Sequence, residues 1–253
     1  MAISEFPNAI ENSLWSHSEF ALNNRSPVKL RGSNFKNTAY IYSNSITDEK
    51  WLWKNVNTTS MIKEFLASYL ASKLGVNVPR SMLAKKGTQI GLLCEWLDES
   101  VELKDTASSV LRKFPPKDVI NLLLLEAWIG GSDRHSGNYL CANDNLWAID
   151  FERSFKTEPL DSELLLHFEW MQKSKNQIKE ELDLFKKLIM QKNVLQDESK
   201  VLNLIDDRPI DSRAKAALKI QVSIIFTSLQ TNFEDLDARI EKYFQGPVVS
   251  LLF

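Results

Sequence analysis

The sequence predicts an α+β fold in which a small, sheet-bearing lobe precedes a larger and mainly helical lobe. Two patterns support this prediction. Runs of β-branched and aromatic residues are concentrated before residue 96, whereas helical periodicity dominates the rest of the chain. The chain has 253 residues, of which 43% are hydrophobic, so it can bury a sizeable core without disulfides. The same composition excludes a disordered chain.

The first part of the chain combines a hairpin, a helix and a buried strand. Residues 38–42 and 51–54 are strand-type runs separated by a polar turn, which indicates a β-hairpin. Ser60 is a suitable N-cap for a helix over residues 61–74, and a glycine follows at the helix end. The continuous apolar run at residues 90–95 is typical of a buried strand.

The second part of the chain is mainly helical. Asp118 is expected to cap a very apolar helix over residues 119–129, which must be buried on nearly every face. A small hairpin is expected over residues 139–150, around an Asn-Asp-Asn turn. Apolar residues recur at helical spacing over residues 178–189, and a further helical region covers residues 212–244.

The charge balance and the cysteine content exclude several classes of protein. Lys and Arg number 31 and Asp and Glu number 33, so no global positive field attracts nucleic acid or an anionic membrane. Cys94 and Cys141 are too few for a disulfide framework or a cysteine-based zinc site, which favours a reducing, cytoplasmic setting. We expect no membrane span and no secretory signal. The glycine spacing excludes a Rossmann fingerprint and a Walker A loop.

One segment, residues 130–155, concentrates the side chains that carry chemistry. Asp133, His135 and Asn138 share a polar loop directly after the buried helix. Asp150 ends an apolar strand, and the intervening hairpin would return it beside Asn138. Carboxylate and carboxamide oxygens are ligands that Mg²⁺ prefers, with phosphate oxygens completing its shell. Phosphoryl transfer needs this arrangement: Asp133 would orient the attacking hydroxyl, and His135 would lie near the transferred group.

A simpler interpretation of this segment is an ordinary turn. Asp, Asn, Ser and Gly are the usual turn residues, and a spacing of Asp-x4-Asn arises by chance in many chains. The combination is more specific, because an aspartate that ends a strand as apolar as Leu-Trp-Ala-Ile is costly to bury without a partner. We therefore favour the chemical interpretation.

The motifs SDRHSGN and WAIDFERSF resemble the catalytic and metal-binding loops of the protein kinase-like superfamily. The resemblance is greatest to the HipA-like kinases and to the phosphoinositide 3- and 4-kinases. It implies that Asp133 is the catalytic aspartate and that His135 is the basic residue of the catalytic loop. It also implies that Asn138 and Asp150 bind Mg²⁺, with ATP as the phosphate donor. Glu152 departs from the glycine that often follows in these families.

The same resemblance implies a protein kinase-like bilobal fold, with an N-lobe at residues 1–96 and a C-lobe at residues 97–253. It requires a strand lysine that binds the phosphates and a helix glutamate that positions the lysine. Lys54 ends a predicted strand, and Glu64 lies ten residues later on the first turn of the predicted helix, in a segment that resembles the HipA-like helix. The alternative for Lys54 is an edge-strand lysine that reaches solvent. Together with the later loops, we favour an ion pair of Lys54 with Glu64.

Two further parts of the nucleotide site follow from the resemblance. Gly32 and Ser33, in the segment RGSNFKN, would belong to the loop that covers the phosphates through its backbone N–H groups. A plain basic turn is an equal alternative for this segment. Glu95 to Leu97 would form the hinge that contacts adenine through its backbone.

The favoured function is that of a HipA-like serine/threonine protein kinase, with ATP and a protein substrate as partners and no direct contact to nucleic acid. The sequence does not predict the oligomeric state. A small-molecule kinase is one alternative, but Gly131 and Arg153 stand where aminoglycoside and choline phosphotransferases have a histidine and a second aspartate. A phosphoinositide kinase is another alternative. An alternative of a different class is a pseudokinase that acts as a nucleotide-binding interaction module.

Overall fold

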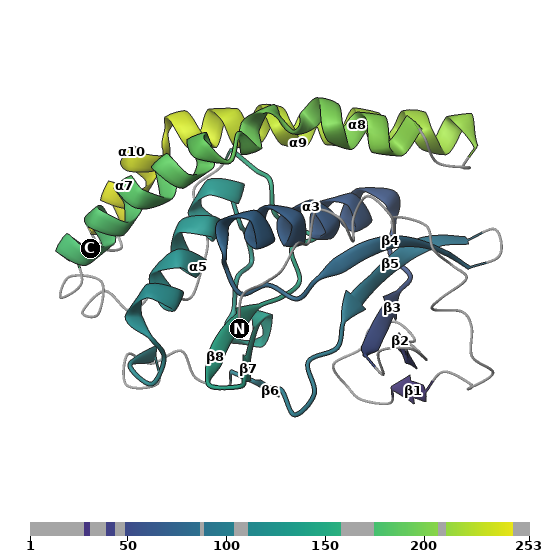
Figure 1. Cartoon of the computed structure of the whole chain (residues 1–253), viewed down its shortest axis with the longest axis horizontal. Coiled ribbons are helices and arrows are strands. Elements are labelled where there is room, and N and C mark those ends of the chain that lie inside the picture. The colour runs from purple at the N-terminus through teal and green to yellow at the C-terminus, as the bar shows by residue number, and fades with distance from the viewer. Residues whose placement is uncertain are drawn as a thin grey trace, which may run out of the picture.

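The structure, a computed structural model, describes residues 28–30, 39–43, 49–86, 89–103, 111–157, 175–206 and 211–244. A five-stranded antiparallel sheet and the helix α3 (Thr58–Leu74) form one side of the molecule. A three-stranded sheet and most of the remaining helices form the larger part of the molecule, and a long C-terminal helix lies along α3 (Figure 1). The predicted α+β class, with a small sheet-bearing part and a mainly helical part, is therefore confirmed.

The five-stranded sheet has the strand order β1-β2-β3-β5-β4. Its strands are β1 (Val28–Leu30), β2 (Ala39–Ser43), β3 (Lys50–Lys54), β4 (Ser81–Lys86) and β5 (Gln89–Glu95). The predicted hairpin is present as β2 and β3, with Tyr42 opposite Trp51. The predicted buried strand is β5, which pairs with both β3 and β4. The edge strands β1 and β4 were not predicted.

The helix α3 begins three residues earlier than predicted, and its cap is Asn57 rather than Ser60. The Asn57 side chain accepts a hydrogen bond from the Ser60 N–H at 2.9 Å, so Ser60 lies inside the first turn. As a result Glu64 lies in the second turn and not in the first. Gly75 ends the helix with a φ of 68°, as the sequence predicted.

The position of α3 explains why the helix is apolar around most of its circumference. It lies between the strands β4 and β5 on one side and the helix α9 (Ser212–Glu234) on the other (Figure 1). At its C-terminal end, Asp197 accepts a hydrogen bond from the Tyr69 hydroxyl at 2.7 Å and an ion pair from Lys73. Both sides of the molecule therefore hold α3 in place.

The apolar helix predicted at residues 119–129 is α5 (Pro116–Ile129), and it is buried over most of its length. Asp118 lies in its first turn and makes no capping hydrogen bond; the N-cap is Pro115, so the predicted cap is wrong. Gly130 ends the helix at a φ of 62°, where a Cβ atom would lie 1.8 Å from the Lys156 carbonyl oxygen. This position therefore requires glycine.

The second sheet carries the loops that the sequence singled out. Its strands are β6 (Val101–Glu102), β7 (Tyr139–Ala142) and β8 (Asn145–Ala148), in the order β6-β7-β8. The predicted hairpin is present as β7 and β8, and a short 3-10 helix, η1 (Ser136–Asn138), leads into it. The strand β8 ends at Ala148, so Asp150 lies two residues beyond the strand and not at its end.

The C-terminal helices pack around α5 and α3 to complete the core. The predicted helix at residues 178–189 is α7 (Lys175–Gln191), whose buried face is Ile178, Leu182, Phe185 and Ile189. The helical region predicted at residues 212–244 is divided at Asp235 into α9 and α10 (Leu236–Phe244). The 3-10 helix η3 (Val194–Gln196) and α8 (Glu198–Asp206), which lies beside α9 (Figure 1), were not predicted. Among the described residues, no helix has the length and apolarity needed to cross a membrane.

Candidate active site

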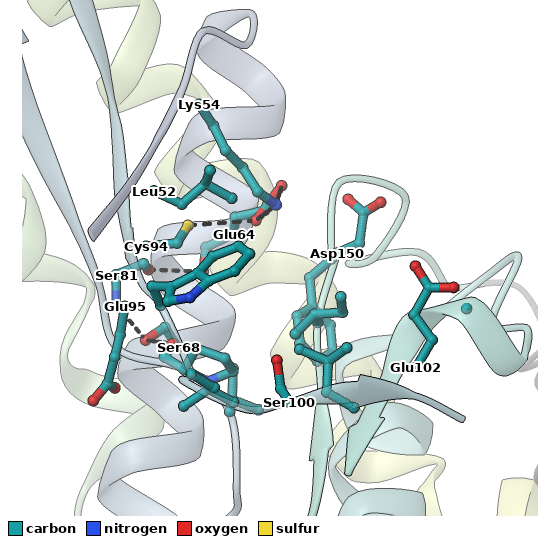
Figure 2. A pocket seen from close by; sticks show the side chains of 18 residues that line it. Leu52, Lys54, Glu64, Ser68, Ser81, Cys94, Glu95, Ser100, Glu102 and Asp150 are labelled. Atoms are coloured by element: carbon teal, nitrogen blue, oxygen red, sulfur yellow. Dashed lines mark hydrogen bonds and ion pairs between the residues drawn. The ribbon is translucent and has the colours of Figure 1, made fainter. Parts of the chain in front are cut away.

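A cleft of about 420 Å³ lies between the five-stranded sheet with α3 and the β7–β8 hairpin. Its volume lies within the range of small-molecule sites. Figure 2 shows Lys54 and Glu64 on one wall and Asp150 and Glu102 on the opposite wall. The cleft is lined by Leu52, Lys54, Glu64, Ser68, Val78, Pro79, Ser81, Cys94, Glu95, Trp96, Leu97, Ser100, Glu102, Gly137, Leu140, Ile149, Asp150 and Phe151.

The strand lysine and the helix glutamate meet in this cleft. The Lys54 ammonium donates to both oxygens of the Glu64 carboxylate, at 2.9 and 2.7 Å, so the predicted ion pair is present. Burial of Lys54 acts against its charge, but the Glu64 carboxylate, with Asp150 beyond it, raises the pKa of Lys54 above its ordinary value. The lysine therefore stays positively charged at any pH at which the protein would work.

The segment after β5 is held to the sheet in a way that leaves one backbone donor available. The Glu95 N–H donates to the Arg80 carbonyl at 2.8 Å, and the Trp96 N–H donates to the Lys50 carbonyl at 2.9 Å. The Glu95 carboxylate is bound by the Arg80 guanidinium at 2.9 and 3.1 Å. Within the part of the chain that the structure describes, the Leu97 N–H donates to no acceptor. Of the predicted hinge, only Leu97 thus offers a donor to a ligand.

The polar loop after α5 presents an exposed carboxylate beside two ordered side chains. Asp133 has a φ of 57° and forms an ion pair with Arg153. The Asn138 Oδ1 accepts from the His135 N–H at 3.0 Å, and the His135 Nδ1 accepts from the Gly137 N–H at 3.2 Å. These two bonds form a capping box that fixes the loop. Because the His135 Nδ1 is used within the loop, Nε2 is the ring nitrogen that can contact a ligand.

A buried arginine that sequence reasoning missed joins this loop to Asp150. The Arg134 Nε donates to Glu126 at 2.9 Å, and its Nη1 donates to the carbonyls of Ile149 and Asp150 at 2.7 and 2.9 Å. The Tyr139 hydroxyl also donates to the Glu126 carboxylate. Since Glu126 is 0% exposed, these donors take the place of the water that would otherwise solvate its carboxylate. The one feature of the sequence that could have indicated this buried ion pair was Glu126, a charged residue in the middle of an otherwise apolar helix.

Asp150 and Asn138 lie close together because the hairpin folds back on itself. The Ile149 N–H donates to the Asn138 carbonyl at 2.9 Å, which places Asp150 at the next position of the chain. Asp150 has a φ of 62° and an exposed side chain that lines the cleft. Among the described residues, no group of three or more His, Cys, Asp and Glu side chains could hold a metal ion. A metal here would therefore need ligand oxygens in addition to those of the protein.

The oxygen donors of Asn138 and Asp150 suit a hard cation such as Mg²⁺. The Asn138 Oδ1 uses one lone pair for the His135 N–H and retains a second, and the Asp150 carboxylate supplies charge. Mg²⁺ is commonly bound by one or two such oxygens together with substrate phosphates and water. Gly32 and Ser33, the predicted phosphate-covering residues, lie outside the described residues.

Cys94 lines the same cleft, and burial raises the pKa of its thiol to about 12. We expect iodoacetamide at pH 8 to alkylate Cys94 roughly a thousandfold more slowly than a thiol of ordinary pKa, because only the thiolate reacts. The raised pKa also predicts a loss of stability as the pH rises from about 9 towards 12, since the unfolded thiol ionises first.

A time course of alkylation, followed by mass spectrometry, measures the first effect. The urea-unfolded chain serves as the control, in which Cys94 should react at the ordinary rate. Equal rates in the folded and unfolded chains would contradict the raised pKa of the Cys94 thiol.

Comparisons with known proteins identify the fold. No protein-family model and no curated protein sequence matches the chain. Among solved structures, it is similar to the Helicobacter pylori proinflammatory kinase CtkA, with 14% identity and a TM-score of 0.53 over 89% of this chain and 96% of that chain. It is also similar to a chain of the Shewanella oneidensis MR-1 complex of HipA, HipB and operator DNA, with 14% identity and a TM-score of 0.53 over 88% of this chain and 68% of that chain. The chain therefore has a HipA-like, protein kinase-like fold.

Proposed function

We propose that this chain is an ATP-dependent phosphotransferase that acts on serine or threonine hydroxyls of a protein. The observation that carries the proposal is the cleft in which the Lys54–Glu64 ion pair faces Asp150, with Asp133 and Asn138 in the adjoining loop.

We also propose that the chain is divided into two lobes, with residues 1–96 forming the N-lobe and residues 97–253 the C-lobe. The pairing of β6 with β7 supports this boundary, because the chain after residue 97 joins the second sheet.

The side chains of this cleft would each have a separate task. Lys54, oriented by Glu64, would bind phosphate oxygens of ATP, and the Leu97 N–H would donate to the adenine ring. Asn138 and Asp150 would hold Mg²⁺, which supplies charge neutralisation of the phosphates when it is bound. Asp133 would accept the hydrogen bond of the substrate hydroxyl and receive its proton as the phosphoryl group transfers. His135 would donate from Nε2 to the transferred group.

The test of nucleotide binding is a thermal melt with and without Mg²⁺ and ATP. We expect saturating Mg²⁺-ATP to stabilise the protein by about 2.7 kcal/mol at ~100 times the dissociation constant, or roughly 5–10 °C for a chain of this length. Asp150→Ala should lose most of this shift, because it removes the carboxylate of the proposed metal site. Asp183→Ala, an exposed aspartate on α7, is the matched control and should keep the shift. An equal shift in wild type and Asp150→Ala would remove Asp150 from the site.

Phosphotransfer itself is measured with γ-labelled ATP and Mg²⁺ against a cell lysate, for wild type and for Asp133→Ala. Label on serine or threonine that depends on Asp133 supports the proposal. Nucleotide binding without any phosphotransfer would favour the pseudokinase alternative. Label on a lipid in place of protein would favour the phosphoinositide kinase. Label on a small molecule would favour the small-molecule kinase.

A further inference from the structure

Arg153 places a permanent positive charge beside the proposed catalytic aspartate. It lies three residues after Asp150, and its Nη1 donates to the Asp133 Oδ2. Both side chains are about half exposed, at 58% for Arg153 and 49% for Asp133. An exposed ion pair of this kind contributes little to folding stability. Folding stability therefore does not explain why Arg153 contacts Asp133.

The backbone around Arg153 is bonded to the loop that carries Asp133. The Ser132 hydroxyl donates to the Arg153 carbonyl at 2.8 Å. Two residues further on, the Phe155 N–H donates to the Ile129 carbonyl at 2.5 Å. These two bonds tie the backbone of the Arg153 segment to the segment that carries Asp133.

Two other cations near the site, among the described residues, are already bound to partners. Arg134 is buried and spends its donors on Glu126 and on backbone carbonyls. Lys54 is bound to Glu64 on the opposite wall of the cleft. Arg153 has five N–H donors, of which the contact with Asp133 uses one. The guanidinium can therefore hold Asp133 and still donate to an anion bound beside that carboxylate.

We propose that Arg153 is a catalytic residue that donates hydrogen bonds to the transferred γ-phosphoryl group while it holds the Asp133 carboxylate through Oδ2. The inference rests on the proposed phosphotransferase function. In the step, an oxygen lone pair of the acceptor hydroxyl forms the new bond to phosphorus. The bond from phosphorus to the bridging oxygen breaks, and its electron pair stays on ADP. The hydroxyl proton passes to the free oxygen of Asp133, and Arg153 is unchanged.

This geometry suits a planar guanidinium better than an ammonium group. Parallel N–H donors match the two oxygens of a carboxylate or of a phosphoryl group, and arginine keeps its charge throughout the working pH range. The Asp133 Oδ1 remains available for the substrate hydroxyl, since Oδ2 is bound to Arg153. A role as an inhibitory latch on Asp133 predicts the opposite result, because removal of a latch would raise the rate.

The experiment compares wild type with Arg153→Ala and Arg153→Lys, using dephosphorylated casein and water as acceptors for the γ-phosphoryl group of Mg²⁺-ATP. We expect Arg153→Ala to lower kcat by about 100-fold or more, with KM for ATP and Kd for ADP changed less than about twofold. Arg153→Lys should recover only part of the rate. Arg213→Ala, at an exposed arginine of α9, is the matched control and should behave as wild type.

Two further measurements separate a catalytic role from a structural one. Fluoroaluminate bound with ADP imitates the transferred phosphoryl group, so it should lower the Kd for ADP in the wild-type protein. In Arg153→Ala, we expect this decrease in Kd to be at least tenfold smaller. Guanidinium chloride, at concentrations that leave the melting temperature unchanged, should restore part of kcat in Arg153→Ala but none in Asp133→Ala.

A wild-type kcat in Arg153→Ala, an increased kcat, or unchanged fluoroaluminate affinity would each overturn the inference and leave the proposed function intact. A wild-type protein that transfers no phosphoryl group from ATP and gains no ADP affinity from fluoroaluminate would overturn both.

Discussion

Arg134→Ala is expected to lower the free energy of unfolding by about 3–5 kcal/mol, because it leaves the Glu126 carboxylate buried without its cation. The two side chains are 1% and 0% exposed, and the Nε–Oε1 distance is 2.9 Å. After the substitution the Tyr139 hydroxyl would still donate to the Glu126 carboxylate, but the Arg134 guanidinium would no longer balance its charge. The same change frees the carbonyls of Ile149 and Asp150, so the cleft should also lose its order. Urea unfolding followed by fluorescence measures the loss.

A double variant separates the ion pair from the folding of the loop. Glu126→Leu combined with Arg134→Met removes both charges and keeps most of the volume, so it should recover much of the lost stability. It should not recover nucleotide binding, since the backbone carbonyls beside Asp150 would still lack their donors. A loss below about 1 kcal/mol in Arg134→Ala would contradict the buried ion pair.

Lys54→Ala is expected to lower kcat/KM for ATP by about three orders of magnitude while the chain stays folded. The reason is that the ammonium, which Glu64 holds at 2.7 Å, is the positioned cation of the proposed phosphate site. Glu64→Ala should reduce turnover in the same direction, because the lysine would lose its orientation. Steady-state kinetics at varied ATP concentration gives the effect, and a thermal melt checks that each variant is folded.

Lys50→Ala is the matched control for this prediction. Lys50 lies on the same strand, but its ion pair with Asp98 is exposed, at 43% and 59%, so its removal should leave kcat/KM unchanged. Near-normal activity of Lys54→Ala would contradict the assignment of the phosphate-binding lysine. A parallel loss in Lys50→Ala would instead indicate that β3 tolerates no substitution.

The parts of the molecule that depend on short-range spacing could be predicted from the sequence. The β2–β3 and β7–β8 hairpins each follow from two apolar runs and a polar turn, and register then places Asp150 near Asn138. The Lys54–Glu64 pair was predicted from the resemblance to HipA-like kinases, which requires a strand lysine and a helix glutamate, and not from local spacing alone. The roles of these residues, and of Asp133 and His135, stay predictions until the kinetics above are measured.

Errors at the helix starts have a local cause. Ser60 and Asp118 both have side chains that cap helices well, but each lies inside a first turn that begins earlier. Asn57 and Pro115 are also acceptable before a helix, and propensity alone does not rank such neighbours. The strands β4 and β1 were missed because an edge strand gains its stability from its partner and has little pattern of its own.

The contacts between charged side chains of different elements, by contrast, were decided by the tertiary structure alone. Glu126 lies in an apolar helix that the sequence predicts, but only the folded chain brings Arg134 and Tyr139 onto its carboxylate. In the same way, the contact of Arg153 with Asp133 depends on two loops that are bonded through Ser132. A sequence determines which residues are near neighbours along a strand or helix, because those distances follow from backbone geometry. Which charge meets which partner depends on how whole elements pack, and that packing follows from the burial of the entire core.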